Sequence, residues 1–186
     1  MLLLETIAVI FSLIYVVLAA KENKWCWGAS TISVSLYIYI CYHAGLYAET
    51  GLQIFYLIMA FYGIWNWSEK QKNKKITVTE WSYKKHVIVL ITGAFLTLIL
   101  GFYFTTYTDA KLPILDSFTT VFSLFATYMV VHKVLENWIY WIVIDLVSVK
   151  LYYSRDLEQT AVLFMIYTVI AVFGYFSWLK KFKANA

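Results

Sequence analysis

Seven apolar stretches follow one another along this chain of 186 residues and leave room for little else. A helix needs about 20 mostly apolar residues to cross the hydrocarbon layer of a membrane, which is about 30 Å thick. The seven stretches lie near residues 3–20, 25–43, 51–68, 86–106, 114–131, 137–153 and 160–179. Charged residues make up 14% of the chain, whereas soluble domains carry about 25%. The sequence therefore predicts an all-α membrane protein with seven transmembrane helices and no water-soluble domain.

The basic residues are distributed unevenly between the two sides of this predicted bundle. Twelve of the fifteen Lys and Arg fall on one side, six of them between Ser68 and Lys85, and only Lys111, Lys150 and Arg155 fall on the other. Cytoplasmic connections carry an excess of Lys and Arg. We therefore expect a multi-pass protein of the bacterial inner (plasma) membrane, with the N-terminus outside and the C-terminus in the cytoplasm. The first apolar run lacks the basic start of a cleavable signal, so it is expected to be the first helix.

An internal repeat appears when the sequence is compared with itself at an offset of 111 residues. At this offset Phe11-Ser12-Leu13 aligns with Phe122-Ser123-Leu124, and Tyr56, Ala60, Gly63 and Trp67 align with Tyr167, Ala171, Gly174 and Trp178. The first three spans are thus predicted to repeat as the last three. The expected organisation is a first three-helix bundle (1–68), a basic cytoplasmic loop with a linker helix (69–110) and a second three-helix bundle (111–186).

Such a parallel repeat favours a transporter, in which the substrate site lies between the two halves near the middle of the membrane. The alternative is a duplicated membrane protein that transports nothing.

The span at 137–153 holds the most polar group at mid-depth. Trp138, Trp141, Asp145 and Tyr152 recur at helical spacing and share one stripe. A carboxylate at that depth costs on the order of 3 kcal/mol and usually faces a site or a wet cavity. Two indoles beside a carboxylate suit a flat cationic ring. The alternative is a structural Asp145 satisfied by Lys150 or Ser148.

Other site candidates come from the remaining spans of the two halves. Gln53, Tyr56 and Tyr167 bring polar groups into apolar helices, where each needs a partner. Trp27 is the counterpart, in the second span, of the Trp138 stripe. The small residues of the same faces, Ala60, Gly63, Ala171 and Gly174, are expected to pack helices together instead.

Nothing in the sequence predicts an enzyme, a metal site or a cofactor. Asp145 has no paired acid, base or nucleophile on its stripe. The two cysteines and three histidines lack the spacing of metal ligands, and no phosphate-binding loop is present. The expected partners are a small molecule and the lipid bilayer, with no nucleic acid.

Several short motifs are spread along the chain: Leu52-Gln53, Tyr62-Gly63 with Trp67, Glu136-Asn137-Trp138 with Trp141, Val147-Ser148-Val149, and Gly174 with Trp178. Together they resemble the PnuC family of vitamin transporters. The resemblance covers nearly the whole chain. It implies a parallel 3+1+3 bundle like that of SWEET sugar carriers, facilitated diffusion of a vitamin that is then trapped by phosphorylation, and a homotrimer. It also adds Asn137 to the candidate substrate-binding residues.

Two departures from the family's nicotinamide riboside members bear on the substrate. The resemblance implies an Asn at each of two positions in those members, and this chain has Ala60 and Asp145 at these positions. The gained carboxylate suits a ligand with fixed positive charge and an aminopyrimidine, so the chain looks closest to the thiamine-carrying PnuT branch. Nicotinamide riboside is also cationic and remains an alternative substrate, and a vitamin-binding receptor without transport remains an alternative function.

Overall fold

The computed structural model describes residues 2–44, 47–68, 77–108 and 112–185, and they form a bundle of helices. The helices are α1 (Leu2–Ala20), α2 (Cys26–His43), α3 (Tyr47–Trp67), α4 (Tyr83–Tyr107), α5 (Pro113–Val131), α6 (Asn137–Tyr153) and α7 (Glu158–Asn185). Each predicted stretch is a helix, and most ends agree within a few residues. The main difference is α7, which continues well beyond residue 179.

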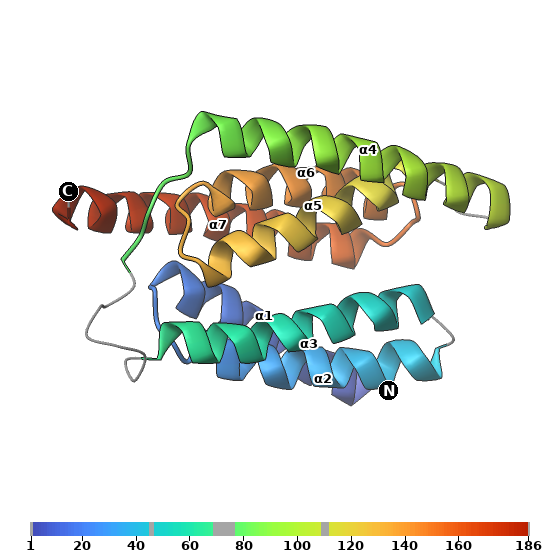
Figure 1. Ribbon diagram of the computed structural model, residues 1–186. Helices are drawn as coiled ribbons and strands as arrows, with labels where there is room; N and C mark the ends of the chain where they lie inside the picture. The colour runs from blue at the N-terminus through green and yellow to red at the C-terminus, as the bar shows by residue number, and fades with distance from the viewer. Residues whose placement is uncertain (1, 45–46, 69–76, 109–111, 186) are drawn as a thin grey trace.

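The helices form two groups that lie against each other (Figure 1). In the first group α1 packs on α2 and α2 on α3; in the second α5 packs on α6 and α6 on α7. The groups meet where α1 contacts α7 and where α3 contacts α5. Helix α4 packs on α5, at the outside of the second group (Figure 1).

Four of the helices, α1, α4, α5 and α7, are long and apolar enough to cross a membrane by length and composition alone. The sequence predicted seven spans, and α2, α3 and α6 are shorter or less apolar than this criterion requires. Helix α6 has 17 residues and includes Asp145 and Lys150. Helices α2 and α3 carry Ser30, Ser33 and Gln53, which line the cavity described below.

The turns after α1 and after α5 have the same local geometry. Glu22 and Lys133 adopt positive φ angles of 59° and 51°. A left-handed residue just beyond a helix is a common way to end it and turn the chain. The two positions are 111 residues apart, which is the offset of the sequence repeat.

The segment before α4 is attached to the turn between α5 and α6. Thr79 donates its backbone N–H to Lys133 O (3.0 Å) and accepts one from Leu135 N (2.8 Å). Val78 beside it is buried. The segment therefore lies at the same end of the bundle as both turns. Residues 69–76 of the lysine-rich loop, with Lys70, Lys72, Lys74 and Lys75, lie outside the described residues.

Candidate functional site

A cavity of about 420 Å³ is lined by residues of both helix groups. It contains eight of the nine residues that the sequence predicted as a substrate site: Trp27, Gln53, Tyr56, Trp138, Trp141, Asp145, Tyr152 and Tyr167. Helices α1, α2, α3, α5, α6 and α7 all contribute to the lining. Side chains predicted from separate spans are thus brought to one place, although their role as substrate ligands stays a prediction.

Asp145 lies in the middle of α6 and is only 3% exposed. Within the part of the chain that the structure describes, it makes no ion pair with Lys150 and no hydrogen bond with Ser148 or any other residue. The alternative in which protein groups neutralise Asp145 therefore finds no support in the geometry. A buried carboxylate without a partner is costly to ionise, and a cationic ligand in the cavity would supply the missing counter-charge.

The charged side chains described around the cavity all carry the same sign. Its lining contains the carboxylic acids Glu5 and Asp145, and among the described lining residues there is no Lys, Arg or His. The cavity consequently favours a cation over an anion.

Four tryptophans close one end of the cavity. Trp27 meets Trp67 edge to face at 5.4 Å between ring centroids, Trp138 meets Trp178 in the same way at 5.4 Å, and Trp67 and Trp178 are 6.0 Å apart. Trp67 Nε1 donates to Val131 O (2.9 Å) and Trp178 Nε1 donates to Ala19 O (3.0 Å). Each of these bonds joins the two helix groups, so the tryptophan layer is fixed to both.

Two glycines make room for this layer. A Cβ atom at Gly63 would collide with the Trp27 ring, and one at Gly174 would lie 2.8 Å from the Trp138 ring. Ala60 and Ala171 are fully buried on the same helix faces. Gly63 and Gly174 therefore allow close helix packing, as the sequence predicted, while Ala171 also lines the cavity.

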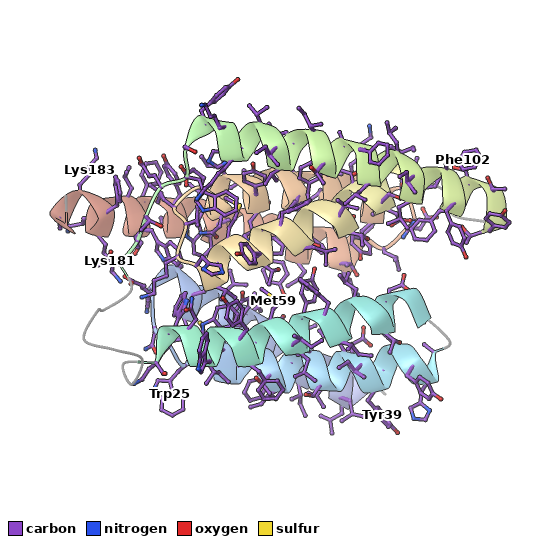
Figure 2. The ribbon with its side chains drawn as sticks, viewed as in Figure 1. Trp25, Tyr39, Met59, Phe102, Lys181 and Lys183 are labelled. Atoms are coloured by element: carbon purple, nitrogen blue, oxygen red, sulfur yellow. The ribbon has the colours of Figure 1, made fainter. Side chains whose placement is uncertain are left out.

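An ionic cluster lies at the end of the bundle where α1 and α5 terminate. Glu22 accepts a hydrogen bond from Lys133 and forms an ion pair with Lys181 of α7 at 2.9 Å. Burial opposes ionisation of Glu22, but the hydrogen bonds and charges of Lys133 and Lys181 outweigh it and lower the pKa of the carboxyl group. Figure 2 shows Lys181 and Lys183 at this end, away from Phe102 of α4. This ionic cluster connects the two helix groups beyond the tryptophan layer.

The cavity extends toward the opposite end of the bundle. Glu5, near the start of α1, lines it and is exposed. Tyr152 lines it too and stacks on Phe164 of α7 at 5.1 Å between ring centroids. Arg155 and Asp116 form an ion pair near this end, between the turn after α6 and the start of α5. The cavity thus reaches the surface at the end where α1 begins.

Two hydrogen bonds between tyrosine and serine cross from one helix group to the other. Tyr56 of α3 donates to Ser123 Oγ of α5 (2.8 Å), and Tyr167 of α7 is bonded to Ser12 Oγ of α1 (2.5 Å). Both partners in one pair are 111 residues from their counterparts in the other. Two of the three predicted site tyrosines, Tyr56 and Tyr167, therefore have protein partners that the sequence did not predict.

Asn137 is the one predicted site residue that does not line the cavity. It is fully buried at the start of α6, and its side-chain amide donates to Val134 O (2.6 Å). Its placement is that of a residue that holds the turn before α6, so its predicted contact with substrate has no support from the geometry.

Several lining residues were absent from the prediction, among them Ser12, Tyr15, Tyr37, Thr127 and Phe164. The alignment of Ser12 with Ser123 in the repeat was the signal that could have identified the first of them. The described residues contain no group of three or more His, Cys, Asp or Glu that could hold a metal ion.

Comparisons with known proteins agree on one family. The sequence profile described as "Nicotinamide mononucleotide transporter" matches residues 2–180. The nicotinamide riboside transporter PnuC of Neisseria mucosa is 26% identical, over 98% of this chain and 74% of its own length. The riboflavin/roseoflavin transporter RibM of Streptomyces davaonensis is 22% identical, over 95% of this chain and 84% of its own length.

A solved structure shows the same fold. The crystal structure of the vitamin B3 transporter PnuC superposes with a TM-score of 0.78 and 23% identity, covering 98% of this chain and 83% of that one. These relatives are named as transporters and not as enzymes. The profile match extends over almost all of the sequence, and the chain therefore belongs to the nicotinamide mononucleotide transporter family, a family of multi-pass membrane transporters.

Proposed function

We propose that this protein carries a cationic vitamin of the nicotinamide riboside class across the bacterial inner membrane by facilitated diffusion. The observation that carries the proposal is the unpartnered Asp145 in a cavity lined by Trp138 and Trp141. Aromatic faces attract a cation, and a desolvated carboxylate supplies its counter-charge. The cavity volume of about 420 Å³ falls within the range of small-molecule sites.

The relatives support this choice of substrate. Transporters from Neisseria mucosa and Escherichia coli are named for nicotinamide riboside, at 26% and 22% identity. The family description names the mononucleotide, but that compound carries a phosphate. Since the described lining holds two acids and no basic residue, we expect the phosphate to be rejected.

Thiamine is a second candidate because of Asp145. The sequence alone favoured thiamine, but the relatives are named for nicotinamide riboside and riboflavin and lend it no support. Asp145 is nevertheless placed in the cavity without a protein partner, where it suits either the cationic ring or the amino group of thiamine. The two cationic vitamins are therefore compared directly in the experiment below.

We also propose a parallel 3+1+3 repeat whose two halves alternate in opening. Equivalent contacts at the 111-residue offset support it: Trp27 with Trp67 matches Trp138 with Trp178, and Gly63 matches Gly174. With the N-terminus outside, the cavity would reach the surface on the outer side and the tryptophan layer would close the cytoplasmic side. The homotrimer stays a prediction from the family resemblance.

The test is uptake into proteoliposomes together with binding by isothermal titration. Nicotinamide riboside, thiamine, riboflavin and nicotinamide mononucleotide are compared on the same purified protein. We expect uptake and binding of a cationic vitamin, and none of the mononucleotide. Binding without uptake would make the protein a receptor, and uptake of riboflavin alone would overturn the cationic site.

A further inference from the structure

We propose that Ser12 and Ser123 are specificity-determining positioning residues, which make Tyr167 and Tyr56 accept hydrogen bonds from the substrate. The transporter would then select ligands that present an N–H or O–H donor beside the cationic ring. This inference rests on the proposed function and concerns the same cavity.

The direction of each tyrosine–serine hydrogen bond follows from the number of hydroxyl protons available. Ser123 Oγ donates to Thr120 O (2.9 Å), and a serine hydroxyl has only one proton. The bond between Tyr56 and Ser123 must therefore use the tyrosine proton, at 2.8 Å. In the second pair Ser12 Oγ donates to Val9 O (2.8 Å), so Tyr167 must be the donor in its 2.5 Å bond to Ser12.

Each tyrosine oxygen is left with lone pairs only. A phenol that has given its proton to serine can accept a further hydrogen bond but cannot donate one. Tyr56, Tyr167 and Asp145 all line the cavity, and Asp145 interacts electrostatically with both hydroxyls. An ionised carboxylate is likewise an acceptor without a proton. These three groups therefore form a cluster of acceptors that matches a donor-bearing cation.

The hydroxyl of Thr127, four residues after Ser123, does not add a hydrogen-bond donor to this cluster. Thr127 of α5 lines the cavity and donates its proton to Ser123 O (2.8 Å). A substrate that offers only a carbonyl or ether oxygen to this cluster brings one acceptor against another, and no hydrogen bond can form. A site built to receive a donor discriminates strongly against the analogue that lacks it.

The experiment compares two cationic ribosides of nearly the same shape. In nicotinamide riboside the ring carries a carboxamide, and in 3-acetylpyridine riboside a methyl group replaces the amide NH₂. We expect wild-type protein to bind the amide at least tenfold more tightly by isothermal titration. For thiamine the matching probe is the analogue in which a hydrogen atom replaces the amino group of the pyrimidine ring.

The variants separate positioning from a general structural role. In Ser12→Ala or Ser123→Ala the tyrosine proton is freed and can be offered to the ketone, so the preference should fall at least threefold. Tyr56→Phe and Tyr167→Phe remove the acceptor and should lower amide affinity while leaving ketone affinity unchanged. Thr168→Val, which removes a hydroxyl bonded to Phe164 O beside Tyr167, is the matched control and should keep the wild-type ratio.

Three results would contradict the inference. Equal wild-type affinity for amide and ketone overturns it while the proposed function stands. Serine variants that weaken both ligands equally show that the pairs only hold the helix groups together. If wild-type protein binds neither nicotinamide riboside nor thiamine, the proposed function fails and the inference fails with it.

Discussion

At the scale of single residues, Asp145 is the side chain whose position is hardest to explain without a ligand. It is 3% exposed and has no partner among the described side chains. Asp145→Asn keeps the shape and removes the charge. Loss of one partner of a desolvated charged contact typically costs about 2–5 kcal/mol, so affinity for the cationic vitamin should fall at least tenfold. Isothermal titration and a melting curve on the same preparation measure this, and the melting temperature should not fall.

The matched control is Asp116→Asn. Asp116 forms an ion pair with Arg155 and does not line the cavity. This variant should lower the melting temperature slightly with near-normal vitamin affinity. If well-folded Asp145→Asn binds the vitamin as wild type does, Asp145 is not part of the site.

Helical spacing predicted much of the candidate site at this scale. The 3–4 periodicity placed Trp138, Trp141, Asp145 and Tyr152 on one face of α6, and all four line the cavity. Periodicity describes one helix at a time, so it could not show that Tyr56 bonds to Ser123, 67 residues away. It also could not show that Asn137 bonds to the preceding turn, since an amide in a motif looks the same in either role.

At the scale of helices, Gly63 and Gly174 set how closely α3 and α7 approach the tryptophans of α2 and α6. Gly63→Ala or Gly174→Ala adds a Cβ that collides with the Trp27 or Trp138 ring. Overpacking of this kind typically costs about 1–3 kcal/mol. Thermal unfolding in detergent should therefore show a lower melting temperature for both variants.

Gly51→Ala is the control within the same helix as Gly63. Among the described residues, no atom outside the local helix backbone lies within 4 Å of the added Cβ, and Ala is favoured over Gly in a helix by up to about 1 kcal/mol. Its melting temperature should stay the same or rise. Equal losses for Gly51→Ala and Gly63→Ala would mean that the close approach to Trp27 does not matter.

The helices themselves were predicted well because each apolar run is bounded by polar residues. The end of α7 was missed because apolarity stops before helicity does: the segment after residue 179 has no Gly or Pro to end the helix. By length and composition alone, four of the seven helices are apolar enough to span a membrane. The helices that fall short, α2, α3 and α6, are those that supply Ser30, Gln53 and Asp145 to the cavity.

At the scale of the whole molecule, Glu22 connects the two helix groups through Lys133 and Lys181. The pKa of the Glu22 carboxyl group in the folded protein is below its ordinary value of 4.5, because the two lysines outweigh the effect of burial. The ionised form is therefore favoured by folding. This stabilisation is fully present above pH 4.5 and is lost as the pH falls through the folded pKa.

A series of melting curves in detergent at decreasing pH measures this contribution. Wild-type protein should lose stability as the pH falls below about 4.5, and Glu22→Gln should be less stable at pH 7 and lose less on acidification. Glu158→Gln, at the start of α7, is the control and should follow the wild-type profile. Parallel pH profiles for wild type and Glu22→Gln would show that the cluster adds no stability.

The orientation of the whole bundle is predicted from twelve basic residues on one side against three on the other. The protein without Cys26 and Cys41, both replaced by Ser, gives a background free of native thiols. In that background Ser82→Cys, just before α4, should be protected from an impermeant maleimide in spheroplasts, and Gln159→Cys, in the first turn of α7, should be labelled. Permeabilised spheroplasts should label both, which controls for access to each thiol. The reverse pattern in intact spheroplasts would invert the topology, and the end closed by the tryptophan layer would then face outward.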